Sequence, residues 1–354
     1  MEHIIEIDGA AGGGGILRAC IALSLGTGKP FHIRDIGARR PRRGLMRRDL
    51  AIATAASALC DAEVAGDEVG SSELLFVPGK PCLVDQAIAL PTGGSIALAL
   101  QAIACPAAAL ASGKLEISLT GSTWNGGAPG PLFMTKALWP LLESMGYRMS
   151  LRILRDGFGA IGGGKAVLAI EGAPAFKRLE ACSLPDSFKV SARIACCRLD
   201  EGIARREEAV LKEMLGLERV EIDLEHRADG SGNGVEVEVA AQGGPSNVFG
   251  AVGAPGTPAE AVASTAAAWA LEFMRQGVPV GRFLAEQILV PLALGAGGEF
   301  VTGKPEELFS GIAKVVRKFT KSPVKCQSLG RGSGKWLIGV EGLRNKGESN
   351  DKQF

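Results

Sequence analysis

The chain of 354 residues has eight cysteines but lacks a CxxC pair and any other spacing typical of metal ligands. Most of the cysteines, such as Cys60 and Cys105, lie in apolar runs, where the thiol behaves as a small hydrophobic side chain. This pattern argues against a cysteine metal site and favours a reducing compartment.

Signals for export and for membrane insertion are also lacking. Residues 1–6 have neither the basic nor the apolar region of a signal peptide. The longest apolar stretch, 96–111, contains Gln101 and Pro106 and is too short to span a bilayer. We therefore expect a cytoplasmic protein with no membrane partner.

There is no large excess of charge, since 39 basic residues face 38 acidic ones and the formal net charge is +1. A polyanion must therefore be bound locally. Six of the ten residues in 39–48 are arginine, and this segment follows a glycine-rich turn at 9–15. The arginine fork and the amides exposed by glycine both suit phosphate oxygens. We predict that an anion-binding face is formed by Arg39, Arg40, Arg42 and Arg43, and the alternative is a solvated basic loop.

Hydrophobic periodicity predicts an α+β fold in which a β-α-β-α-β-β unit occurs twice in tandem. The first unit has expected strands at 3–7 and 30–35, helices at 16–25 and 45–60, and two strands ending near 77. The second has helices at 95–111 and 131–145 and strands at 114–119, 148–154 and 166–170.

The composition and hydrophobic pattern of the sequence change after residue 171. A charged helix is expected at 205–215, an alternating strand at 234–239 and an Ala-rich helix at 259–276. We therefore predict core repeats in 1–180, a small inserted α/β domain in 181–275, and a return to the core in 276–354.

The first strand, glycine turn and helix are also compatible with a dinucleotide-binding fingerprint, because Asp35 follows Gly15 by twenty residues. Two features disfavour a nicotinamide enzyme. Asp8 would face the pyrophosphate, and the arginine-rich segment takes the place of a continuing parallel sheet.

Several sequence segments, taken together, identify a protein family more specifically than the glycine turn alone. They are Asp8–Arg18 (DGAAGGGGILR), 36–46 (IGARRPRRGLM), Gly157-Phe158 with 162–164, 286–291 (EQILVP) and 298–300 (GEF). In this order and spacing the chain resembles the RNA 3′-terminal phosphate cyclase family, which is related to the enolpyruvyl transferases. The resemblance covers residues 3 to about 340. It implies repeated β-α-β-α-β-β units with a small inserted domain.

The resemblance also implies a reaction, in which ATP and Mg²⁺ convert an RNA 3′-phosphate to a 2′,3′-cyclic phosphate through a histidine that carries AMP. RNA 3′ ends would then be the partner. By position, Arg18 and Arg40 correspond to phosphate-binding arginines. The family ATP contacts fall on Gln101 and on the stretch Phe283, Leu284, Ala285, Glu286 and Gln287, with Glu286 in place of the usual aspartate.

The chain departs from the family pattern at the nucleophile. The family histidine falls at Glu307 or Leu308, and no histidine follows His226. Lys304 is a weaker candidate to replace it. The glycine turn is shorter than the family's and lacks its glutamate and glutamine, and no metal ligand is identified. The catalytic residue is thus unassigned, and two hypotheses stay open: a cyclase with a changed nucleophile, or a non-catalytic paralogue that binds RNA or a protein partner.

Overall fold

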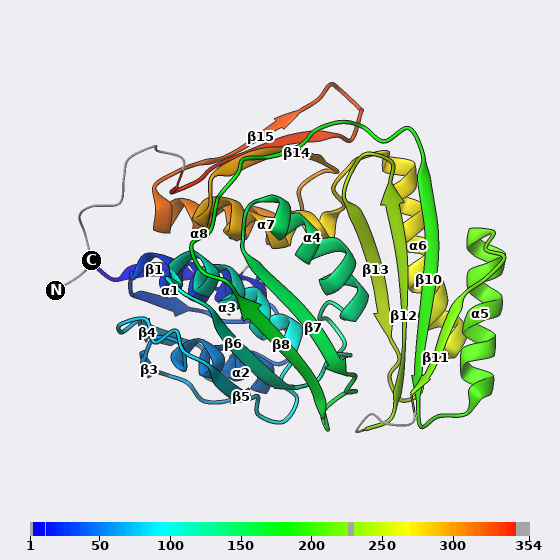
Figure 1. Ribbon diagram of the computed structural model, residues 1–354, viewed down its shortest axis with the longest axis horizontal. Helices are drawn as coiled ribbons and strands as arrows, with labels where there is room; N and C mark the ends of the chain where they lie inside the picture. Colours follow the sequence, from blue (N-terminus) through cyan, green and yellow to red (C-terminus); the bar gives the residue numbers. More distant parts are fainter. Residues whose placement is uncertain (1–2, 11, 226–229, 345–354) are drawn as a thin grey trace.

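The computed structural model describes residues 3–10, 12–225 and 230–344, so Ala11 and His226 lie outside the described residues. The chain has the predicted α+β fold, with four mixed four-stranded sheets (Figure 1). None of the helices in these ranges combines the length and the apolar character needed to cross a bilayer.

Both predicted repeats are present. The first comprises β1 (Ile5–Asp8), α1 (Gly14–Thr27), β2 (Phe31–Arg34), α2 (Arg47–Ser57), β3 (Glu63–Ala65) and β4 (Leu74–Val77). The second comprises β5 (Gln86–Ala89), α3 (Ile96–Leu110), β6 (Leu115–Gly121), η1 (Phe133–Leu138), α4 (Trp139–Ser144), β7 (Met149–Arg155) and β8 (Gly164–Ile170). Each sheet joins a parallel pair to two antiparallel strands, in the orders β1-β2-β4-β3 and β5-β6-β8-β7.

A third copy of the unit is interrupted in sequence. It comprises β9 (Leu179–Ala181), α7 (Arg282–Leu294), β14 (Gly297–Thr302), α8 (Glu307–Thr320), β15 (Val324–Ser328) and β16 (Trp336–Glu341). Its sheet order, β9-β14-β16-β15, repeats the order and strand directions of the other two. Between β9 and α7 the chain forms the inserted α/β unit.

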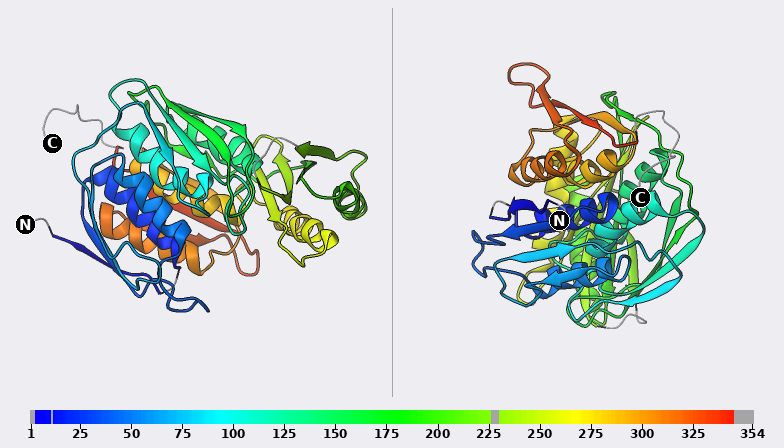
Figure 2. Two further views of the ribbon diagram at one scale, coloured as in Figure 1. Left: turned by 90° about the horizontal axis from the view of Figure 1, so that it is seen from below. Right: turned by 90° about the vertical axis from the view of Figure 1, so that its left-hand side faces the viewer.

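The inserted unit has its own sheet and its own hydrophobic cluster. It comprises β10 (Phe188–Cys197), α5 (Glu201–Leu215), β11 (Glu221–Glu225), β12 (Gly232–Ala241), β13 (Ser246–Val252) and α6 (Ala259–Gln276). The sheet order is β11-β10-β12-β13, and α5 and α6 pack together beside it (Figure 1). Figure 2 shows this unit extending from one end of the core. The boundaries at 181 and 275 stay a prediction.

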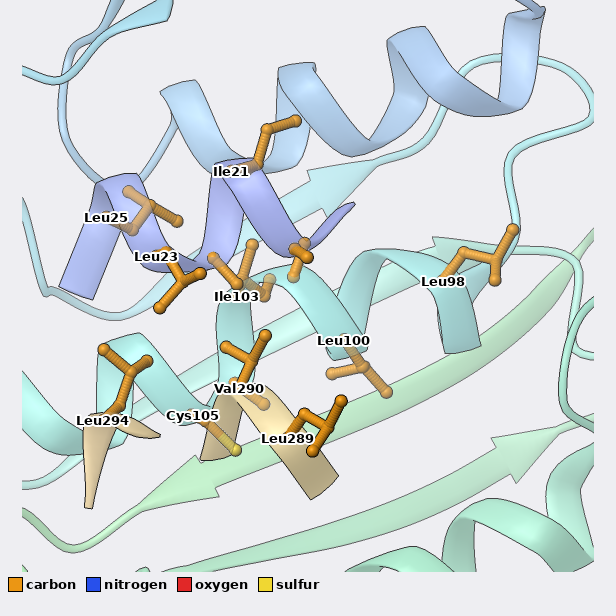
Figure 3. Close-up of a cluster of buried hydrophobic side chains, with 14 of the residues drawn as sticks. Ile21, Leu23, Leu25, Leu98, Leu100, Ile103, Cys105, Leu289, Val290 and Leu294 are labelled. Atoms are coloured by element: carbon orange, nitrogen blue, oxygen red, sulfur yellow. The ribbon is translucent and has the colours of Figure 1, made fainter. Parts of the chain in front are cut away.

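The core lies between the helices of the three repeats. Helix α1 contacts α2, α3, α7 and α8, and its sequence is apolar on nearly all sides, as expected for a buried helix. Figure 3 shows Leu23 of α1 beside Ile103 of α3, with Leu289 and Val290 of α7 close by, while Ile21 points away from Ile103. This packing places the starts of α1 and α8 side by side.

The helix expected at 131–145 is present over 131–144, and it contains a π-helical segment, η1, before α4. Pro140 lies in the first turn of α4 and has no N–H to donate to the preceding turn. One alternative needs correction. The dinucleotide-binding alternative is wrong, since β2 pairs antiparallel with β4 and the sheet therefore does not continue in parallel.

One buried carboxylate joins the inserted unit to the core. Glu236 on β12 is fully buried and accepts hydrogen bonds from the backbone N–H groups of Leu132 (2.8 Å) and Phe133 (2.9 Å) at the start of η1. These are free donors of a helix N-terminus, so the contact satisfies them. Burial raises the pKa of Glu236 to about 7, although these hydrogen bonds act in the opposite direction.

Candidate functional site

The glycine turn is shaped around one arginine. Gly13, at the N-cap of α1, has φ 50° and ψ −125°, a conformation that favours glycine. A Cβ built on Gly13 would lie 2.1 Å from Nη2 of Arg40. The turn can therefore hold the Arg40 guanidinium against its backbone only because no side chain is present.

Arg40 also faces a buried acid. Its Nη1 lies 3.7 Å from Oδ2 of Asp49, which accepts a hydrogen bond from the N–H of Met46 (3.0 Å) and so caps α2. The Asp49 side chain is only 1% exposed, and its Oδ1 has no hydrogen-bond partner among the residues that the structure describes. Arg40 is the nearest compensating charge for Asp49 and is held in place from two sides.

The rest of the arginine segment points outward. Arg39, Arg42 and Arg43 are exposed, whereas Arg40 is half-buried. Gly37 (φ 65°) and Gly44 (φ 83°) fold the loop back, and the N–H of Gly44 donates to the carbonyl of Ile36 (2.8 Å). The four arginines thus divide into one that contacts the glycine turn and three that face solvent.

A small cavity lies where α1, α3, α7 and α8 meet. It measures about 30 Å³. Its lining includes Arg18, Gln101, Glu286, Gln287 and Leu308. Residues that are far apart in the sequence, and that the family resemblance associates with ATP or phosphate, therefore share one space.

The polar groups of this cavity are incompletely paired. Both Nε2 and Oε1 of Gln101 are buried, and within the described part of the chain neither has a hydrogen-bond partner. Burial lowers the pKa of the Arg18 guanidinium to about 10, with Asp49 opposing this effect. Burial raises the pKa of Glu286 to about 7, helped by Glu306 and opposed by Arg18. Unpaired buried polar groups in a cavity are typical of a site that binds a polar ligand.

The remaining residues of the 283–287 stretch lie outside this cavity. Leu284 and Ala285 are buried in the core. The ring of Phe283 packs edge-on against Trp269, with centroids 5.3 Å apart, and Arg282 lies over it at 4.6 Å. Contact of these three residues with ATP stays a prediction.

The resemblance predicts the family histidine at the start of α8. Glu307 is exposed and forms an ion pair with Arg39, while Glu306 pairs with Arg282 at 3.2 Å. Leu308 faces the opposite way, and a Cβ built on Gly15 would lie 2.6 Å from its Cδ1. Lys304 is exposed on the loop after β14. Of the three candidate nucleophile positions, only Leu308 lines the cavity.

Three charged residues of the site were missed by the sequence reasoning. Arg48 and Asp49 both act on the Arg18 pKa, and Arg282 acts on the Glu286 pKa. No signal in the sequence placed Asp49, which caps α2 in the structure, beside the glycine turn. No three or more His, Cys, Asp or Glu side chains gather as a metal site within the ranges the structure describes.

Comparison with known proteins gives a consistent result. A family model described as RNA 3′-terminal phosphate cyclase matches residues 10–326. The RNA 3′-terminal phosphate cyclase of Ectopseudomonas mendocina is 35% identical over 92% of this chain and 95% of its own length. That of Salmonella enteritidis is 33% identical over 94% of this chain and 98% of its own. The enolpyruvyl transferase NikO from Streptomyces tendae aligns over 98% of this chain and 50% of its own, with a TM-score of 0.37 and 12% identity, which is too low to support an argument.

Proposed function

The chain belongs to the RNA 3′-terminal phosphate cyclase family, and from this we propose that it binds RNA 3′ ends but has lost the efficient cyclase reaction of its family. The binding surface is the glycine turn with Arg40 and the outward-facing Arg39, Arg42 and Arg43. Guanidinium groups beside free backbone amides suit the phosphates of an RNA end.

The observation that carries the proposal is the start of α8. Accepting AMP requires a nucleophile that attacks phosphorus and later leaves. Leu308, which faces the cavity, can do neither. Glu307 is turned outward into its ion pair with Arg39, and its adenylate would be a mixed anhydride exposed to hydrolysis. Lys304 is exposed, away from the cavity lining.

The cavity residues fit the polar part of a nucleotide. Arg18 offers positive charge, and Gln101 and Gln287 offer amide groups, so these residues would hold a bound ATP. A cavity of about 30 Å³ admits a water molecule. It is far below the ~300 Å³ of a small-molecule site. Nucleotide binding therefore requires the cavity to widen, and Leu308 is one of the side chains that line it. Mg²⁺ would be held chiefly by the phosphates, since the described residues contain no cluster of acids for it.

Two assays test the proposal together. Fluorescence anisotropy with an RNA that ends in a 3′-phosphate measures binding, and incubation with α-labelled ATP and Mg²⁺ followed by denaturation measures covalent AMP. We expect salt-sensitive RNA binding and no stable label on the protein. A label that is lost in acid but kept in base would indicate a phosphoramidate and contradict the proposed loss of the reaction.

The binding half of the proposal has its own variants. Arg42→Glu with Arg43→Glu should weaken RNA binding, because neither side chain forms an ion pair with the described residues and both face solvent. Arg148→Glu with Arg205→Glu is the control for charge reversal elsewhere, since both residues are exposed and lie directly before β7 and on α5. Equal affinities for the parent, the variant and the control would exclude the arginine face as the binding surface.

The alternative is a non-catalytic paralogue whose partner is a protein. In that case RNA binding would be absent at physiological salt. A cytoplasmic location remains a prediction in either case.

A further inference from the structure

The outer face of α8 carries a row of basic side chains. Lys314, Arg317 and Lys321, here named the α8 basic stripe, are exposed and follow one another at i, i+3 and i+7. This spacing places Lys314 and Arg317 on one side of the helix, and Lys321 follows at its C-cap. Helix α8 packs on α1 and α7 (Figure 1). The side opposite the stripe is apolar and buried. The stripe is thus a solvent-facing surface on a firmly packed element.

The stripe is continuous with the arginine segment. Glu307, which pairs with Arg39, lies on the same side of α8 as the stripe, seven residues before Lys314. A helix rises 1.5 Å per residue, so the row from Glu307 to Lys321 extends about 20 Å from the arginine face.

The charges of the stripe are not neutralised locally. From Leu308 to Lys321 the sequence contains no acidic residue. Among the ranges that the structure describes, none of the three side chains has a carboxylate within 4 Å. By contrast, Arg39 and Arg282 each form an ion pair with a glutamate at the start of α8. Lys318 differs, because its Nζ donates to the backbone carbonyl of Glu6.

Helix stability does not account for the stripe. Cations near a C-terminus complement the helix dipole, but this effect is confined to the last turn and so leaves Lys314 unexplained. Lys321 is the C-cap residue with φ 63°, whereas α1, α5 and α6 have glycine at this position. A lysine there is conformationally less favourable than glycine.

We propose that the α8 basic stripe binds the backbone phosphates of the RNA upstream of its 3′ end. This inference rests on the proposed function. The arginine face and the stripe together form one positive path, and a polyanion with evenly spaced phosphates can follow it. The large apolar side chains of α8, Phe309, Ile312, Val315, Val316 and Phe319, are buried, so the stripe offers no apolar group for insertion into a lipid surface.

The test compares RNA of two lengths. One probe is a single-stranded RNA of about twenty nucleotides and the other is only about three nucleotides long, both with a 3′-phosphate, and affinity is measured by anisotropy over about 50–200 mM salt. The variant is Lys314→Gln, Arg317→Gln and Lys321→Gln. The control removes three exposed lysines elsewhere, Lys114→Gln, Lys165→Gln and Lys177→Gln.

For the long RNA, the stripe variant should reduce the slope of log affinity against log salt by about 2, because each phosphate contact contributes about 0.7 for a single strand. The short RNA should bind the parent and the stripe variant equally. The control should leave both probes unchanged.

Each other outcome contradicts the inference in a distinct way. If the parent binds the long RNA and the stripe variant has the same affinity and slope, the stripe is not part of the path, while the proposed function stands. If the control lowers the slope as much as the variant, net charge alone is responsible. If the parent binds neither RNA, the proposed function fails and the stripe with it. Equal losses for both lengths would mean that the substitutions act through the 3′-end site.

Discussion

Glu236 should make the stability of this protein depend on pH in a direction opposite to that of an ordinary paired carboxylate. Burial raises its pKa from 4.5 to about 7. The folded state therefore holds a proton between these two values that the unfolded state has released. The contribution of this group to the free energy of unfolding is full below pH 4.5 and is lost as the pH rises through about 7.

The magnitude follows from the shift. One pKa unit corresponds to about 1.4 kcal/mol, so the loss between pH 4.5 and pH 8 is about 3 kcal/mol. Glu236→Gln cannot ionise, and its single amide oxygen can accept from only one of the two N–H groups that now donate to separate carboxylate oxygens. The loss of the other hydrogen bond costs the same at both pH values and so does not enter the pH-dependent difference. We expect this variant to gain about 3 kcal/mol relative to the parent between the two pH values. Glu207 and Glu286, whose pKa values are also raised, are present in both proteins and cancel in the difference.

Urea unfolding of parent and variant near pH 5 and near pH 8, followed by tryptophan fluorescence, measures the effect. Glu238→Gln is the matched control, since it removes a carboxylate from the same strand at a half-buried site that water reaches. Glu236→Ala should be destabilised at both pH values, because the two N–H groups lose their acceptor. If the difference between Glu236→Gln and the parent is the same at both pH values, the physical reasoning about this buried carboxylate is wrong.

Three further changes probe the site. Arg40→Glu with Arg43→Glu should weaken RNA binding roughly tenfold and lower the slope of log affinity against log salt by about 1.4. If the slope measured by anisotropy is unchanged, the arginine segment is a solvated loop and does not bind RNA. Gln287→Ala should reduce the rise in melting temperature that ATP produces. Identical rises in variant and parent would show that Gln287 does not contact ATP. Leu308→Ala should enlarge the cavity and increase the same ATP-dependent shift, and a smaller shift than in the parent would show that Leu308 does not restrict entry.

The repeats could be predicted because their elements carry local signals. Helix α6 was expected at 259–276 and has these bounds, since Pro258 precedes it and Gly277, in the left-handed conformation, ends it. The third repeat escaped detection because its first strand, β9, has three residues and is separated from α7 by the whole inserted unit. Periodicity within a short window cannot join segments so far apart.

The site could be predicted only in part, for a similar reason. The run of arginines is visible in the sequence, but the inward turn of Arg40 depends on Gly13 and Asp49, which contact it from other segments. Gln101 and Glu286 entered through the family resemblance and share a cavity in the structure. The opposite directions of Glu307 and Leu308 follow from how α8 packs on α1, which the sequence does not specify.

The most direct test of the central claim is a turnover assay with an RNA that ends in a 3′-phosphate, in the presence of ATP and Mg²⁺. We predict binding of the RNA without efficient formation of 2′,3′-cyclic ends, because the only candidate nucleophile position that lines the cavity is occupied by Leu308. Robust ATP-dependent cyclisation would contradict the claim, and Lys304→Ala and Glu307→Ala would then identify the group that accepts AMP.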